Sequence, residues 1–200
     1  TSQHHKISDF IKIKKKKMEF FIDCGNPPSD NFVKHYQAGC LSFELNSNKQ
    51  KIICNSGYGK YLSSKLTSLS CSTAAHSTLY LNNTSSCIFQ KNKIINKIYG
   101  NSLIEKLKII DKNYTENKDF YSLEASHNGY EKKFGYVHAR SIKISKNGGK
   151  IFGHDELKKT KKYLGLLNYF IRFHVYPGTK IVKTAAGNSI LISLSNGEGW

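Results

Sequence analysis

The feature that most constrains this chain is an alternation of apolar and polar residues in short runs that turn sequences separate. The run at residues 136–145 is followed by Lys-Asn-Gly-Gly and then by a run at 150–152. Asparagine and glycine supply the positive φ angles of a tight hairpin turn. Successive side chains of a strand point to opposite faces of a sheet, so this period of two predicts half-buried strands joined by hairpins.

The same pattern recurs along the chain. Runs at 180–184 and 189–194 flank Ala-Ala-Gly-Asn, runs at 41–45 and 51–54 flank a polar pentapeptide, and residues 169–176 alternate up to Pro177-Gly178. Segment 102–111 fits the spacing of a helix as well as that of a strand, and we assign it as a strand. Short strands at such intervals predict an all-β fold, either a sandwich or a barrel.

Charge narrows the class of partner. The chain carries 31 lysine and arginine residues against 14 aspartate and glutamate residues, a formal net charge of +17, which attracts acidic polysaccharide, nucleic acid or anionic lipid. Since 29 of the 31 cations are lysine, a bias of composition explains the charge equally well. Only Arg140 and Arg172 offer a two-pronged fork for bases, which disfavours nucleic acid. The longest apolar run, at 163–171, is about half of the ~20 residues that cross a bilayer, so we expect no membrane span.

The five cysteines form no Cys-x-x-Cys pair, and they lie at Cys24, Cys40, Cys54, Cys71 and Cys87. Their odd number argues against a complete disulfide framework and mildly favours a reducing compartment such as the cytoplasm. We expect most of them to pack as small buried hydrophobic side chains.

Three polar clusters lie between the predicted strands: HYQAGCLSFEL at 35–45, NSGY at 55–58 and STAAHSTL at 72–79. In this order and at these intervals they resemble the C-terminal β-sandwich of heparinase II/III-like polysaccharide lyases, and STAAHSTL is the most specific piece. Runs at 23–28, 126–130, 134–140 and 172–174 continue the resemblance. It implies a large two-layer antiparallel β-sandwich over residues 20–200, with residues 1–19 as a basic edge segment of the same domain.

The resemblance also implies a function. Lyases of this family cut uronate-containing polysaccharide by β-elimination, and an α/α toroid domain upstream of the sandwich performs much of the proton transfer. We therefore expect anionic polysaccharide as the partner, and no activity from the sandwich alone. The alternatives are a non-catalytic module that binds anionic glycans and, behind it, a basic domain that binds nucleic acid nonspecifically. The resemblance favours the bacterial cell envelope, whereas the cysteine count favours the cytoplasm.

Four candidate site residues follow from the resemblance. His35 matches the histidine that lies near the reacting sugar, and it is the candidate catalytic residue. His76 matches the last ligand of a structural zinc, whereas Gln37 and Asn55 replace the histidine and aspartate ligands. One imidazole and two amides supply no charge to offset the desolvation of zinc, so we expect no cofactor. Zinc at this degenerate site, or a site rebuilt with Cys40 and Cys54, is the alternative; without metal, the three side chains can hydrogen-bond one another.

One tyrosine ends the second cluster and another follows it three residues later. The aromatic faces of Tyr58 and Tyr61 suit the apolar face of a pyranose ring, which makes both candidate substrate-binding residues. Packing in the core is the alternative role for each of them. For His127, Arg140 and His174 the resemblance implies a position in the fold and no chemistry.

Overall fold

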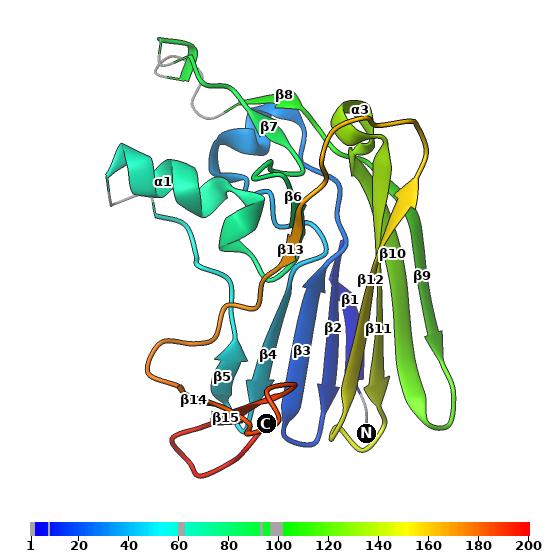
Figure 1. Ribbon diagram of the computed structural model, residues 1–200. Helices are drawn as coiled ribbons and strands as arrows, with labels where there is room; N and C mark the ends of the chain where they lie inside the picture. The colour runs from blue at the N-terminus through cyan, green and yellow to red at the C-terminus, as the bar shows by residue number, and fades with distance from the viewer. Residues whose placement is uncertain (1–2, 8, 60–62, 93, 97–101) are drawn as a thin grey trace.

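Two antiparallel sheets form the body of the computed structural model, which describes residues 3–7, 9–59, 63–92, 94–96 and 102–200 (Figure 1). One sheet has the order β1-β2-β3-β4-β5 and the other has the order β12-β11-β10-β9. The strands of the first sheet are β1 (Gln3–Ile7), β2 (Phe10–Lys15), β3 (Met18–Asp23), β4 (Phe43–Ser47) and β5 (Gln50–Ile53). Those of the second are β9 (Ile109–Glu116), β10 (Phe120–Tyr130), β11 (Tyr136–Ser145) and β12 (Ile151–Lys159).

The core lies between these sheets and follows from the alternation in the strands. In β3, Met18, Phe20 and Ile22 are buried while the residues between them are only partly covered. Ile142 and Ile144 of β11 face them from the other sheet and belong to the same apolar cluster. Burying apolar side chains from two facing sheets is what stabilises a sandwich. The predicted two-layer antiparallel β-sandwich is therefore confirmed.

Most of the predicted hairpins form. β11 and β12 pair across the Lys-Asn-Gly-Gly turn, where Gly148 has φ +74°. β14 (Lys180–Lys183) pairs with β15 (Ile190–Ser193), and β4 pairs with β5. The segment that fitted both periods contains β8 (Leu103–Glu105), which pairs with β7 (Ile88–Phe89), and the start of β9. The strand assignment of this segment is thus confirmed.

The long strand predicted over 169–176 is wrong in its extent. Only β13 (Tyr169–Ile171) forms, it pairs with β6 (Leu79–Leu81), and its side chains are exposed. Beyond it, Arg172 and His174 direct their side chains to the carbonyl of Ala74. These bonds hold the backbone across the end of the first sheet, so only Val175 makes an isolated bridge, to Ile53.

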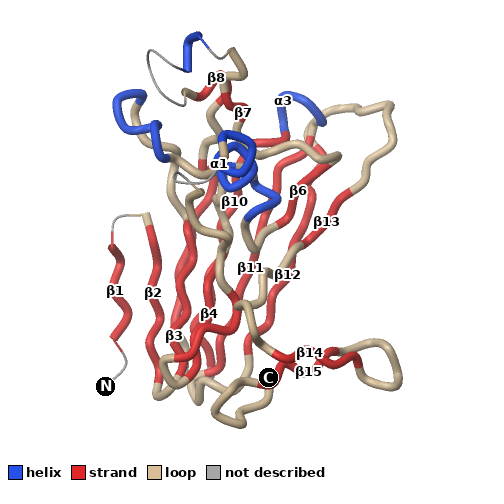
Figure 2. The backbone as a smooth tube through the Cα atoms, turned by 90° about the vertical axis from the view of Figure 1, so that its left-hand side faces the viewer, coloured by secondary structure: helices blue, strands red, loops and turns tan. Residues whose placement is uncertain are grey.

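The helical elements gather at one end of the sheets, and the β14–β15 hairpin lies at the other (Figure 2). They are η1 (Asp30–His35), α1 (Ser64–Cys71), η2 (Thr73–Ala75) and α3 (Glu131–Phe134). The outermost strand of the first sheet is β1, whereas Lys14 to Lys17 occupy the end of β2 and the turn into β3.

All five cysteines are free thiols, and four of them are buried. Within the described residues, no helix is long and apolar enough to cross a membrane.

Candidate functional site

His76 follows η2 and is 3% exposed. Its Nδ1 lies 2.8 Å from the carbonyl oxygen of Ser72, and its Nε2 lies 3.2 Å from Oε1 of Gln37. Because a carbonyl oxygen can only accept, Nδ1 carries a proton. Burial lowers the pKa of His76, against the opposing effect of the Ser72 bond, so the neutral ring offers a lone pair at Nε2. Gln37 satisfies that lone pair when its amide presents the NH2 group.

Asn55 completes this cluster by binding the chain next to His76. Its Oδ1 accepts from the backbone N–H of Ser77 at 2.9 Å, and its Nδ2 donates to Oγ of Ser42 at 3.3 Å. Gln37 therefore contacts the His76 side chain directly, whereas Asn55 binds the same segment only through the backbone N–H of Ser77. The network among the three side chains that the sequence suggested forms for one pair only.

The donor set at this cluster does not fit a zinc ion, because it has one imidazole, two neutral amides and no anionic ligand. Across residues 3–7, 9–59, 63–92, 94–96 and 102–200, no three His, Cys, Asp or Glu side chains are grouped as metal ligands. Burial raises the pKa of the Cys40 thiol well above its usual range, which disfavours the thiolate that zinc binds.

His35 is the last residue of η1 and is exposed. Its ring meets the ring of Tyr58 edge-on, with 5.3 Å between centroids. Tyr58 is half-buried in the loop between β5 and α1, and burial raises the pKa of its hydroxyl. The structure thus brings two of the candidate residues together on the flank that carries η1 and α1. Tyr61 lies outside the described residues.

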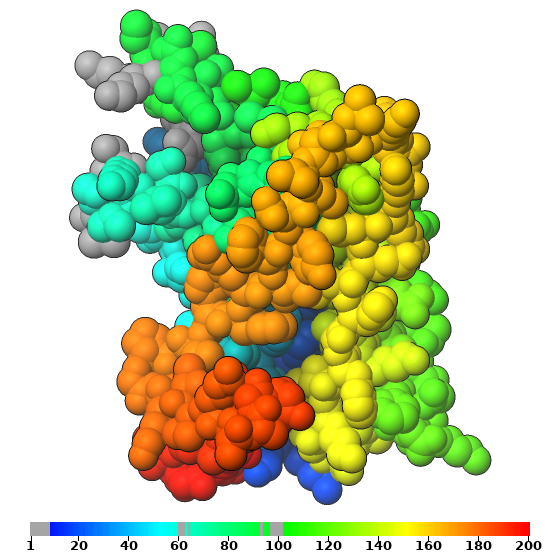
Figure 3. All heavy atoms as spheres, viewed as in Figure 1, coloured from blue at the N-terminus to red at the C-terminus, as the bar shows by residue number. Residues whose placement is uncertain are grey.

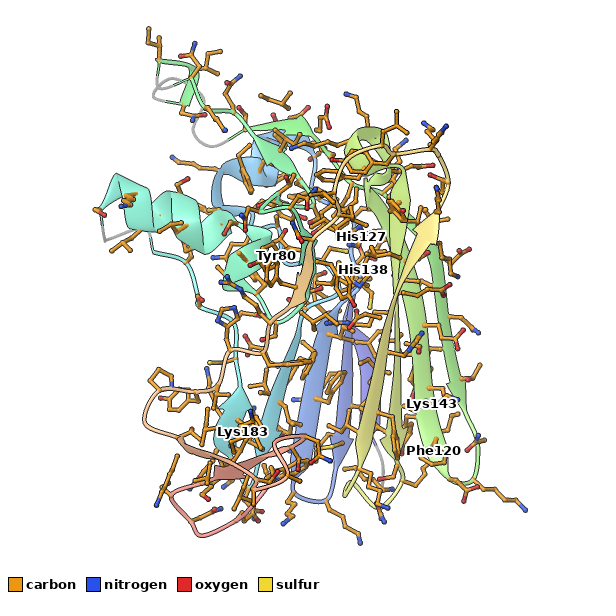
Figure 4. All side chains as sticks on the ribbon, in the orientation of Figure 1. Tyr80, Phe120, His127, His138, Lys143 and Lys183 are labelled. Atoms are coloured by element: carbon orange, nitrogen blue, oxygen red, sulfur yellow. The ribbon has the colours of Figure 1, made fainter. Side chains whose placement is uncertain are left out.

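Sequence reasoning missed a buried polar network between the sheets, which we call the inter-sheet network: His127, His138, Arg140 and Asp155. Figure 4 shows His127 and His138 side by side at the helical end of the sheets. Nε2 of His138 lies 2.7 Å from Oδ1 of Asp155, and Nδ1 of His138 lies 3.2 Å from Nε2 of His127. Arg140 binds Asp155 with two nitrogens, Nε at 2.7 Å and Nη2 at 2.9 Å.

The protons in this network have a fixed order. The backbone N–H of Gly129 donates to Nδ1 of His127, so the proton of that ring sits on Nε2 and is donated to His138. His138 in turn donates from Nε2 to Asp155. Burial lowers the pKa of both histidines and keeps them neutral. Burial alone would raise the pKa of Asp155, but the bonds from His138 and Arg140 lower it to about 2.

An apolar cavity of about 730 Å³ opens between the edges of the two sheets. Its mouth lies between the segment after β13, the C-terminal hairpin and β12 (Figure 3). Phe43, Phe152, Phe173 and Trp200 line it, and Arg140 and Asp155 border it. None of the described candidate residues from the sequence lines this cavity, so it is distinct from the His35–His76 region.

Comparisons place this arrangement among known proteins. The profile of the family described as Heparinase II/III-like, C-terminal, matches residues 3–200. The heparan sulfate lyase HepC from Pedobacter heparinus has a similar fold, with a TM-score of 0.72 and 16% identity over 99% of this chain and 28% of that one. A heparinase III structure has a TM-score of 0.67 and 14% identity over 100% of this chain and 28% of that one. No curated protein sequence matches. This chain, which spans 28% of the length of those lyases, belongs to the heparinase II/III-like family and corresponds to its C-terminal domain.

Proposed function

We propose that this chain is the sandwich part of a lyase that cuts uronate-containing polysaccharide by β-elimination. The observation that carries the proposal is the pairing of exposed His35 with Tyr58, beside the His76 cluster, in a chain of net charge +17. In this proposal the sandwich forms one wall of the glycan cleft. An α/α toroid domain in the whole protein forms the other wall and performs most of the proton transfer.

The chemistry assigns a role to each side chain. β-Elimination needs the uronate carboxylate neutralised, the C5 proton removed, and the leaving C4 oxygen protonated as the C4–O bond breaks. Imidazole is the commonest general acid or base in enzymes, so His35 can neutralise the carboxylate or carry a proton at the reacting sugar. Tyr58 offers a flat ring to the apolar face of a pyranose and a hydroxyl to its polar edge. The remaining positive charge raises the local concentration of an anionic chain.

A second candidate function is a module that binds anionic glycans without cutting them. The specific observation in its favour is that amides stand where the resemblance implies a histidine and an aspartate ligand, because Gln37 and Asn55 serve as hydrogen-bonding groups around His76. Such a site keeps the geometry that binds a glycan without groups that would cut it. Nonspecific binding of nucleic acid ranks behind both, since the chain has only two arginines.

The decisive experiment uses the protein as its gene encodes it, incubated with heparan sulfate, hyaluronan and alginate. Lyase activity creates an unsaturated uronate whose ultraviolet absorbance is followed with time. We expect activity on at least one substrate and a loss of about a hundredfold or more in H35A, the lower end of a general acid–base contribution. H154A is the matched control, because His154 is exposed on β12 and lies away from His35. Absent absorbance with retained glycan binding would overturn the lyase proposal in favour of the binding module.

A further inference from the structure

Arg140 is one buried side chain that holds two separate segments of the candidate site. It is 3% exposed and projects from β11 toward the first sheet. Its Nη1 donates to the carbonyl oxygen of Leu41 at 2.7 Å and to that of Ser77 at 2.9 Å. Leu41 follows the segment that carries Gln37, and Ser77 follows His76 directly. A residue of the second sheet thus ties together the two segments whose side chains meet at the His76–Gln37 bond.

The segments that Arg140 binds have little freedom to settle elsewhere. Leu41 is fully buried with φ +61°, a left-handed conformation that a branched side chain rarely adopts. Two residues earlier, a Cβ on Gly39 would stand 2.6 Å from Cδ2 of His76, so this backbone already lies against the imidazole. A shift of Leu41 therefore moves Gly39 relative to the His76 ring.

Asp155 and the histidines fix the direction of the guanidinium. Asp155 lies opposite Arg140 in the register of β11 and β12 and takes both Nε and Nη2, which leaves Nη1 aimed at the two carbonyls. His138 binds Oδ1 of the same carboxylate, the oxygen that also accepts from Nε of Arg140. A planar fork can serve one carboxylate and two carbonyls at once, whereas an ammonium group is a single point donor.

We propose that Arg140 and Asp155 are positioning residues, which set the His76–Gln37 bond and with it the glycan-facing wall that His76 and Asn55 support. The importance of that wall for glycans rests on the proposed function, but the positioning itself does not. Neither residue touches the glycan in this proposal. Their effect passes through backbone carbonyls.

The test follows the Nε2 nitrogen of His76, the atom that meets Gln37, by NMR of the 15N-labelled protein without glycan, the signal being identified by its loss in H76Q. In R140K, which keeps the charge but not the fork, we expect that signal to lose at least half of its intensity or to shift. D155N should produce the same change, and it guards against a failure of R140K to fold. I144A is the matched control, because Ile144 is fully buried on the same face of β11 and its aliphatic side chain can make no hydrogen bond to either segment.

The outcomes separate the two proposals. The same change in I144A at an equal loss of thermal stability would overturn the positioning role, because any destabilised sandwich would then show it. An unchanged His76 signal in folded R140K and D155N would overturn it as well. Heparin-oligosaccharide affinity is measured in parallel, and we expect it to fall about tenfold in R140K and less than twofold in I144A. If the unmodified protein binds no glycan, the proposed function fails while the NMR comparison still decides the role of Arg140.

Discussion

His76 is held as much by the backbone around it as by its own hydrogen bonds. Because a Cβ on Gly39 would overlap the imidazole, we expect G39A to lower the free energy of unfolding by about 1–3 kcal/mol, the usual cost of overpacking a buried site. Urea unfolding measures the difference. G149A is the control, since the nearest neighbour of its added methyl is an ordinary 3.4 Å away, and its effect should be close to zero. Equal stability of the two variants would show that Gly39 has room.

The inter-sheet network predicts how stability depends on pH. His127 and His138 have pKa values lowered by burial, so the folded state keeps them neutral while the unfolded chain binds protons below about pH 6.5. Their contribution is present above that pH and is lost as the pH falls. The pKa of Asp155, at about 2, is also below its unfolded value, so its contribution disappears only between about pH 4 and pH 2. The groups facing the histidines are Asp155, Arg140 and the ring of Tyr130.

We therefore expect the free energy of unfolding to fall between pH 7.5 and pH 5.5 by on the order of 1 kcal/mol for each of these two histidines. Urea titrations at several pH values measure the slope. NMR titration supplies the assignment, because the rings of both His127 and His138 should stay neutral over this range. A stability that is level over the range, or protonation of His127 in the folded protein, would contradict the prediction.

Residue by residue, the sequence was informative about the candidate site only where side-chain type matched a motif. His35, Gln37, Asn55 and His76 could be named in advance, but the contact of His35 with Tyr58 could not, because it joins a short 3-10 helix to a loop. Asp155 was missed although a signal existed. His138 and Arg140 alternate on the buried face of a predicted strand, and the Lys-Asn-Gly-Gly turn places residue 145 opposite residue 150, and hence 140 opposite 155. A buried arginine on such a face needs a carboxylate partner.

At the scale of elements, the strands with one buried face were predictable and the segments held by side-chain-to-backbone bonds were not. β4, β11 and the start of β12 follow from alternation and turn chemistry. Residues 172–176 show the same alternation, yet Arg172 and His174 bind the carbonyl of Ala74, which no local pattern encodes. α1 was missed because its sequence, SKLTSLSC, has a weak apolar stripe; Ser63 caps it by accepting from the N–H of Leu66.

The layered core makes a prediction at this scale. Phe20 of β3 is fully buried and its ring stacks on Phe43 of β4 with centroids 5.2 Å apart. We expect F20A to lower the free energy of unfolding by about 3–5 kcal/mol, as for other buried aromatic residues cut back to alanine. F152A is the same change at a side chain that is 52% exposed on β12, and it should cost less than about 1 kcal/mol. Comparable losses in the two variants would mean that the face of β3 is not the centre of the core.

Over the whole molecule, the densest run of positive charge lies apart from the candidate site at His35. Lys14 to Lys17 lie at the end of the first sheet opposite η1 and His35, beside the C-terminal hairpin (Figure 1). A polyanion releases counterions when it binds, so the logarithm of glycan affinity should fall linearly with the logarithm of salt concentration. If the glycan binds at His35, H35A should weaken binding at every salt concentration with little change of slope.

The quadruple variant K14Q/K15Q/K16Q/K17Q tests where on the protein the glycan binds. Because these lysines are far from His35, their loss should reduce affinity only through the weakened overall field, most at low salt, and should lower the slope by much less than four ion contacts. The matched control for a change of four charges replaces the two lysine pairs on either side of Thr160, at the end of β12 and just beyond it: Lys158, Lys159, Lys161 and Lys162. A slope reduced by nearly four in the first variant alone would place the glycan on the β2–β3 turn. The glycan would then be held by the charge of these lysines, far from His35, and His35 would have no substrate to act on.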